Sequence, residues 1–149
     1  MKKILTIMAV STLLNSAVCQ AYSNDQNVAN NGYDIVNYFV ANEAARGSKQ
    51  FSTDHKGSTY YFVDADNLEA FKQNEEKYLP QFDGYCAFAV AKMKKKVPVN
   101  PETFRIDDGK LYLFFNDYYD GSPFNTIVPW LQNESEMEKM AFQNWKEIK

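Results

Sequence analysis

The sequence predicts a small α+β domain, in which two β-hairpins form an antiparallel sheet that packs against several short helices and a C-terminal helix. Two segments of alternating β-branched and aromatic residues each surround a glycine turn, and apolar residues recur at helical spacing between and after them. The hydrophobic content of 45% is enough for one core. No internal repeat is apparent, so we expect a single domain.

The first part of the domain predicts a short helix, a hairpin and a second helix. In residues 32–40, GYDIVNYFV, Asp34 is placed to cap the short helix. Residues 49–64, KQFSTDHKGSTYYFVD, predict two strands, because β-branched and aromatic residues flank the turn at Gly57. Residues 64–80 then place apolar side chains at helical spacing and end on a proline, which predicts a helix.

The second part predicts a helix, a hairpin and a longer C-terminal helix. In residues 82–96, Asp83 is placed to cap a helix that carries Cys86 in its first turn. Residues 103–116, TFRIDDGKLYLFFN, predict a hairpin with an Asp-Gly turn, and a proline-containing loop follows. Residues 133–148 predict the last helix, with one apolar stripe facing the core. The stripe consists of Met137, Ala141, Trp145 and Ile148.

Residues 1–21 have the layout of a secretory signal peptide. Two lysines precede a short apolar stretch, and small residues lead to Ala21, after which we expect cleavage. The stretch is too short to span a membrane as a mature helix, so we expect a secreted or periplasmic protein with no integral membrane segment. A lipid on Cys19 is the alternative. Residues 22–31 are polar and predict a disordered lead-in to a domain over residues 32–149.

The charge of the chain argues against nucleic acid as a partner. Cleavage would remove the two positive charges of Lys2 and Lys3 and no acidic residue, so the net charge would move from −3 to −5. A chain this acidic has no electrostatic reason to bind nucleic acid or anionic lipid.

After removal of the leader, Cys86 would be the one remaining cysteine, and three interpretations compete for it. It is a small apolar residue of the core, a metal ligand, or a nucleophile. A helix start lowers the pKa of a thiol, but the carboxylate of Asp83 in the same turn would disfavour a second negative charge. A catalytic base would have to be His55, the single histidine of the chain.

The order of several motifs resembles the secreted branch of the YHS-domain family. The motifs are GYDIVNYF, HKGSTYYFVDADNLEAFKQNEEKYLPQFDGYCAFAV, DGKLYLFFN and a closing NW, and they cover residues 32–145. The resemblance implies a small α+β domain related to TRASH-like metal-binding modules. The metal-binding relatives carry cysteines where this chain has Asn37, Val63 and Asn67 or a neighbour. The usual thiolate ligands of the family are therefore missing here.

We expect a binding or accessory protein rather than an enzyme, which holds a metal ion such as copper, or a small ligand, near Cys86. The candidate metal ligands are Cys86 and His55, since copper and zinc take thiolate or imidazole donors. Aromatic clusters are suited to line a pocket for a small ligand or a protein partner. The candidate ligand-binding residues are Tyr33, Asp34, Tyr61, Tyr85 and Cys86. The alternatives are a metal-free protein-interaction module with Cys86 in the core, and a thiol-dependent enzyme.

Overall fold

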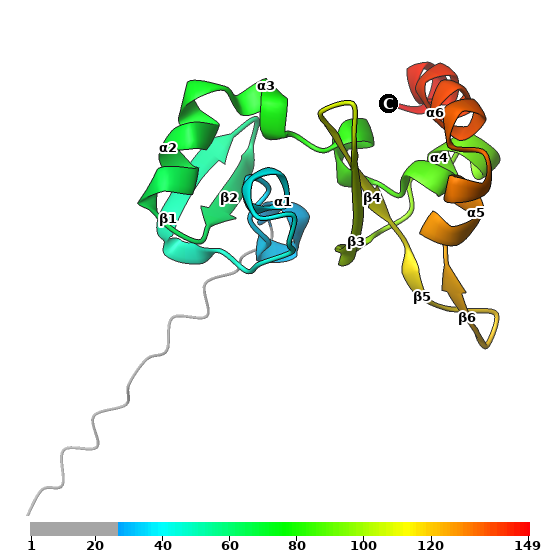
Figure 1. Cartoon of the computed structure of the whole chain (residues 1–149), viewed down its shortest axis with the longest axis horizontal. Coiled ribbons are helices and arrows are strands. Elements are labelled where there is room, and N and C mark those ends of the chain that lie inside the picture. The colour runs from blue at the N-terminus through cyan, green and yellow to red at the C-terminus, as the bar shows by residue number, and fades with distance from the viewer. Residues whose placement is uncertain (1–26) are drawn as a thin grey trace, which may run out of the picture.

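The structure is a computed structural model that describes residues 27–149 of the 149-residue chain. The expected signal peptide and residues 22–26 of the expected lead-in lie outside the described residues. Short helices and three antiparallel hairpins follow one another along the described chain, which confirms the α+β class (Figure 1). No helix of the described part has the length and apolar character needed to cross a membrane.

The first half of the described chain forms a hairpin covered by short helices. Its elements are η1 (Ala29–Gly32), α1 (Asn37–Val40), β1 (Ser48–His55), β2 (Ser58–Phe62), α2 (Ala65–Gln73) and α3 (Glu75–Tyr78). The side chain of Asp34 caps the turn into α1 as predicted, because its Oδ1 accepts hydrogen bonds from the N–H groups of Val36 at 2.8 Å and Asn37 at 3.1 Å.

Part of the expected lead-in belongs to the fold. The backbone oxygen of Asn27 accepts a hydrogen bond from the N–H of Thr59 at 2.9 Å, and its side chain donates to the backbone oxygen of Gly57 at 2.9 Å. Residues 27–31 therefore lie against the first hairpin, and the folded part starts before Gly32. The polar composition of this segment concealed its role, because its contacts run through backbone groups and side-chain amides.

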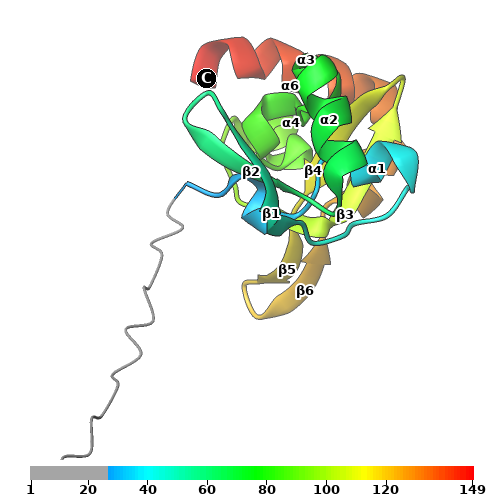
Figure 2. The same cartoon turned by 90° about the vertical axis from the view of Figure 1, so that its left-hand side faces the viewer.

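The second half contains the other two hairpins and the longest helix. Its elements are η2 (Gln81–Gly84), α4 (Ala87–Met93), β3 (Asn100–Asp107), β4 (Lys110–Phe114), β5 (Asn116–Tyr119), β6 (Ser122–Asn125), α5 (Ile127–Gln132) and α6 (Glu134–Ile148). The β5–β6 hairpin replaces most of the loop predicted there, and it projects from the rest of the second half (Figures 1 and 2). The apolar stripe of α6 faces the second core as predicted.

The two halves repeat one backbone plan, although no repeat is apparent in the sequence. Ser48 pairs with Phe62 in the first hairpin, and 52 positions later Asn100 pairs with Phe114 in the second. The register shifts after each of these pairs, and the remaining pairs also recur at the same offset.

The repeat extends to the turns before each hairpin. The three residues 30–32 and, 52 positions later, the three residues 82–84 all have positive φ. An isolated parallel bridge joins Val28 to Thr59, and its counterpart joins Pro80 to Leu111. The side chains differ at most of these positions, so the shared plan shows in the backbone register and turns rather than in the residues.

The strand β4 separates two hydrophobic cores. Successive side chains of a strand point to opposite faces. Leu111 and Leu113 accordingly pack in a first core with Phe62 and Phe71, and Tyr112 and Phe114 pack in a second core with Trp130. These four residues of β4 are at most 1% exposed. Figure 1 shows β3 and β4 between the first-half elements and the helices α4, α5 and α6.

The sequence predicts that the two hairpins join into one antiparallel sheet, but in the structure they remain separate. Each of the three in the described chain is a separate two-stranded sheet. The apolar side chains on both faces of β4 explain the difference, because each face needs its own layer of packed residues. The second hairpin therefore stands as a partition between two cores instead of extending the first sheet.

Candidate functional site

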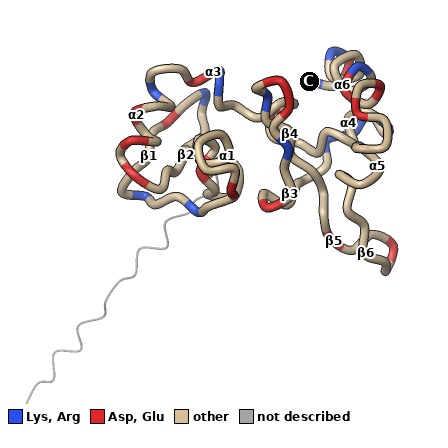
Figure 3. Tube along the Cα trace, viewed as in Figure 1, with Lys and Arg blue, Asp and Glu red and all other residues tan. Residues whose placement is uncertain are grey.

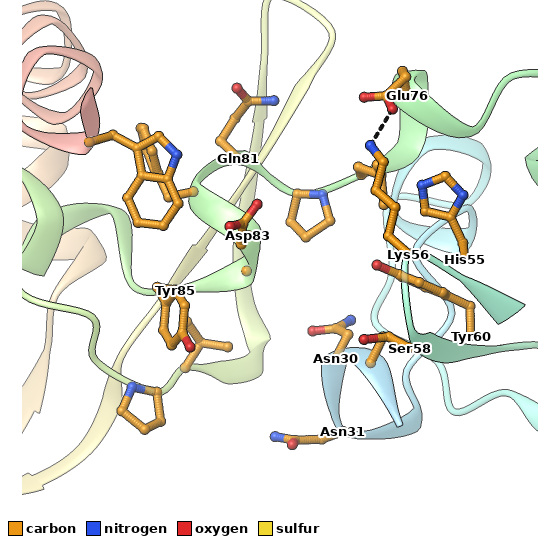
Figure 4. A pocket seen from close by; sticks show the side chains of 18 of the residues that line it. Asn30, Asn31, His55, Lys56, Ser58, Tyr60, Glu76, Gln81, Asp83 and Tyr85 are labelled. Atoms are coloured by element: carbon orange, nitrogen blue, oxygen red, sulfur yellow. Dashed lines mark hydrogen bonds and ion pairs between the residues drawn. The ribbon is translucent and has the colours of Figure 1, made fainter. Parts of the chain in front are cut away.

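A cleft of about 720 Å³ lies between the two halves. The first half contributes residues of η1 and of the tip of the β1–β2 hairpin, and the second half contributes the η2 turn and two residues of α6. Figure 4 shows Asn30, Ser58 and Tyr60 on one wall, and Asp83 and Tyr85 opposite them. The repeat places the two left-handed turns, residues 30–32 and 82–84, at this same cleft.

His55 lies on the first wall and is nine-tenths buried. Its side chain is 10% exposed, and its Nδ1 lies 2.9 Å from Oε2 of Glu75. Because a carboxylate only accepts hydrogen bonds, Nδ1 carries the proton. In the neutral ring Nε2 is then an acceptor, and this buried atom has no hydrogen-bond partner among the described residues. The ring is held by edge contacts with Tyr60 and Phe71.

The second wall is built around a strained turn. Phe82 and Asp83 have φ of 58° and 52°, a region that is uncommon for residues other than glycine and unusual for a bulky one. The ring of Phe82 is 4% exposed and packs against Tyr112 and Trp145, so its burial offsets the strain. The next residue, Asp83, is exposed and lines the cleft.

Two polar groups of the cleft, the side-chain oxygen of Asn30 and the carboxylate of Asp83, have no hydrogen-bond or ion-pair partner among the described residues. The amide of Asn30 donates to the backbone oxygen of Tyr33 at 3.4 Å and to the hydroxyl of Tyr38 at 3.0 Å, but its buried Oδ1 has no partner in the described part. The carboxylate of Asp83 makes no ion pair or hydrogen bond with any described residue, while Lys56 pairs with Glu76 at 2.6 Å.

Charges of both signs line the cleft, with Lys56 and Glu76 on its first wall and Asp83 on its second. Burial raises the pKa of the Tyr60 hydroxyl above its usual value, and the charges of Asp83 and Glu76 raise this pKa further. Lys96 does not line the cleft, but its ammonium lies 5.3 Å from the ring centre of Trp145 and 5.6 Å from that of Tyr85, two residues of the second wall. Along the described part of the chain, basic residues are interspersed with acidic ones (Figure 3).

Cys86 lies in the interior and outside this cleft. It is 0% exposed, and its Sγ lies 3.3 Å from the backbone N–H of Phe115 and 3.3 Å from Oγ1 of Thr126. It stands immediately before α4 rather than in its first turn. Asp83 belongs to η2, so the predicted cap of this helix by Asp83 is wrong. The left-handed conformation of residues 82–84 moves the helix start beyond the aspartate.

Asp34 is the counterpart of Cys86 in the first half, 52 positions earlier. It is 0% exposed, and its Oδ2 accepts hydrogen bonds from the N–H of Val63 and from Nδ2 of Asn67, both at 2.8 Å. Val63 and Phe115 are themselves 52 positions apart. Each half therefore has a buried acceptor that ties the start of its short helix to the end of its hairpin.

The other candidate ligand-binding residues are distributed over three places. Tyr85 lines the cleft. Tyr33 lines a second hollow of about 420 Å³, where its hydroxyl donates to Glu102 at 2.9 Å and the guanidinium of Arg46 lies over its ring. Tyr61 is half-buried in β2, with its ring against Gly32.

The two candidate metal ligands are not brought together around one site. The polar contacts of Cys86 are with Phe115 and Thr126, and His55 contacts Glu75 and two aromatic rings. No group of three or more His, Cys, Asp or Glu side chains is placed to hold a metal ion in the described structure. The residues around Cys86 do not fit a copper or zinc site, because a thiol there has a hydroxyl and a backbone N–H as its polar neighbours.

Three residues that line the cleft were not predicted as site residues from the sequence. The sequence predicts Asn30 in the lead-in, Asp83 as a helix cap, and Trp145 only as part of the core stripe. The Asn-Asn-Gly and Phe-Asp-Gly triplets were the available signal, because asparagine, aspartate and glycine tolerate left-handed turns. Searches against protein families, characterised proteins and solved structures give no match for this chain.

Proposed function

We propose that this chain is a secreted or periplasmic, YHS-like binding protein without catalytic activity, which holds a small organic ligand in the cleft between its two halves. The observation that carries this proposal is the pair of buried acceptors in the cleft wall, His55 Nε2 and Asn30 Oδ1, which have no partner among the described residues. The sequence resemblance supports the family, and the predicted leader supports the location.

Buried polar atoms are nearly always hydrogen-bonded, and each one left unpaired costs about 1 to 3 kcal/mol. Two such atoms in one cleft are therefore explained most simply by a ligand that pairs with them. The cleft volume of about 720 Å³ suits a small molecule, and the aromatic side chains that line it supply apolar contact area. Its polar groups come from both halves, so a bound ligand would bridge them.

A thiol-dependent enzyme finds less support. The thiol of Cys86 is buried and contacts no imidazole or carboxylate in the described part of the chain. A thiolate nucleophile needs access to substrate and a neighbouring base or positive charge. The surroundings of Cys86 favour the interpretation as a structural residue.

A protein-interaction module is the second candidate, because the β5–β6 hairpin exposes large aromatic side chains. Tyr118 is 70% exposed, Tyr119 55% and Phe124 38%. Aromatic residues of this kind are enriched in protein interfaces. The two candidates differ in which surface responds to substitution, the cleft or the projecting hairpin.

A ligand-observed NMR screen of small fragments against the mature chain tests the proposal. We expect fragments that bind to the wild-type protein and lose binding in Ser58→Phe, which fills the cleft. The control Ser122→Phe places the same ring on an exposed strand of the third hairpin and should leave binding unchanged. Fragments that bind both variants equally, or no fragments at all, would contradict a ligand site in the cleft. Intact mass of the secreted protein, expected to start at Tyr22, tests the location.

A further inference from the structure

We propose that the ligand of the cleft carries a protonated amine next to an apolar or aromatic group. This inference rests on the proposed function, since it assigns a chemical class to the ligand of the same cleft. It follows from the hydrogen-bonding character of the two buried atoms without partners and from the charge distribution of the walls.

Both buried atoms are acceptors, and their neighbours fix this assignment. The hydroxyl of Tyr38 donates to the backbone oxygen of Pro101 at 2.8 Å, so it must accept from Asn30. The backbone oxygen of Tyr33 can only accept as well. The Asn30 amide therefore presents its NH₂ group to both, and its buried oxygen is left without a partner among the described residues. The carboxylate of Glu75 places a proton of His55 on Nδ1, so that Nε2 of the neutral ring is an acceptor.

The walls favour a positively charged donor over a neutral one. Asp83 forms no ion pair at contact distance with a described residue, and the nearby Lys56, on which its charge acts, is already paired with Glu76. The charges that act on the Tyr60 hydroxyl come from Asp83 and Glu76, and both are negative. An ammonium group would supply the hydrogen-bond donors that the acceptors lack and would meet the unpaired charge of Asp83.

The aromatic wall suits the apolar part of such a ligand, next to its amine. The ammonium of Lys96 already lies over the rings of Tyr85 and Trp145, both of which line the cleft. Ring faces attract cations through their quadrupole. The part of a ligand next to its amine would gain apolar contact with Phe142 and the exposed edges of these rings.

Three probes with the same ring and different end groups test this inference: 2-phenylethylamine, 2-phenylethanol and phenylacetate. Each is titrated into the ¹⁵N-labelled mature chain, and backbone and indole chemical shifts are followed. We expect the amine to shift residues of both walls and to bind about tenfold or more tightly than the alcohol, as a charge-assisted hydrogen bond would give. Asp83→Asn should remove most of this preference.

Asp108→Asn is the matched control for Asp83→Asn. Asp108 also has positive φ, is exposed, and lies at the tip of the β3–β4 hairpin outside the residues that line the cleft. The substitution removes the same charge, so an equal loss of amine binding in both variants would overturn the inference as a general charge effect. Equal or tighter binding of the alcohol or of phenylacetate in the cleft would overturn it too, while leaving the binding function standing. If none of the three probes shifts cleft residues, the amine inference fails, and the fragment screen with Ser58→Phe then decides separately whether the cleft binds any small molecule.

Discussion

At the scale of single residues, the two halves hold different chemistry at one equivalent position. Asp34 and Cys86 are both fully buried, and each accepts the N–H of the residue just after its hairpin, Val63 or Phe115. A carboxylate meets four donors in the first half. A thiol meets one N–H and one hydroxyl in the second. The role of Cys86 is therefore structural, because its thiol links the start of α4 to the residue that follows the second hairpin.

We predict that Cys86→Val destabilises the protein more than Cys86→Ser. Valine fills a similar volume but leaves the N–H of Phe115 without an acceptor, which costs about 1 to 3 kcal/mol. Serine keeps a polar atom near that N–H and the Thr126 hydroxyl, so we expect a loss of about 1 kcal/mol. Urea unfolding at neutral pH measures both. A Val variant as stable as the wild type would show that the contact with Phe115 does not matter.

The buried hydroxyl of Tyr38 predicts a loss of stability in alkaline solution. Burial is the main cause that raises the pKa of Tyr38 from 10.0 to about 12. Because the folded-state pKa lies above the unfolded-state value, the contribution of Tyr38 is fully present below pH 10 and is lost as the pH rises toward 12. At pH 11 this loss amounts to about 1.4 kcal/mol.

Comparison with Tyr38→Phe isolates this effect. At pH 8 the variant should be less stable than the wild type, because the hydroxyl bonds both Pro101 and Asn30. By pH 11 the difference in unfolding free energy should narrow by about 1.4 kcal/mol. A constant difference for Tyr38→Phe would mean that this hydroxyl titrates normally.

At the scale of elements, the sequence predicts correctly those turns and hairpins whose conformation depends only on residues close together in the chain. The turns at Lys56-Gly57 and Asp108-Gly109 have positive φ at both positions, as two-residue hairpin loops require, and both hairpins form as predicted. The predicted Asp83 cap was wrong, because the turn that contains it is stabilised by distant packing of Phe82.

The candidate site was also predictable only in part, because it depends on packing between residues that are far apart in the sequence. Tyr85 and His55 were singled out and do line the cleft, but their aromatic and histidine character alone could not place them opposite each other. The cleft depends on the arrangement of the two halves, and the repeat that arranges them has little sequence identity to reveal it. Cys86 and Asp34 were singled out by residue type, and tertiary packing placed them in the interior.

Two glycines of the hairpins should respond differently to alanine. A Cβ at Gly47 would lie 2.3 Å from the backbone carbon of Tyr61, so the strands would have to separate. A Cβ at Gly109 would meet nothing within 4 Å, and only its φ of 69° opposes the change. We expect Gly109→Ala to cost about 1 kcal/mol and Gly47→Ala to cost clearly more. Thermal unfolding of both variants measures the order, and the reverse order would contradict the close approach at Gly47.

At the scale of the whole molecule, β4 makes the core of the first half depend on the second half. Leu111 and Leu113 complete the core of the first half, although they belong to the second hairpin, and Tyr112 and Phe114 serve the second core. The first half therefore lacks part of its own core, whereas the second core is built from residues of the second half alone. The cleft lies along the same boundary, so the geometry of its walls depends on this shared strand.

We therefore predict that the described chain unfolds in one cooperative transition and that its first half does not fold alone. Leu113→Ala, which enlarges the first core, should cost about 2 to 5 kcal/mol. The loss of stability should be the same in both halves. The fluorescence of Trp130 and Trp145 reports it for the second half as a shift of the unfolding midpoint, and hydrogen exchange of β1 and β2 reports it for the first half as a lower opening free energy. A chain that ends at Leu79 should give the NMR spectrum of an unfolded protein, because the two leucines of its core are missing. A folded spectrum for that fragment, or an early transition confined to the first half in Leu113→Ala, would show that the two halves are independent domains and that β4 merely lies between them.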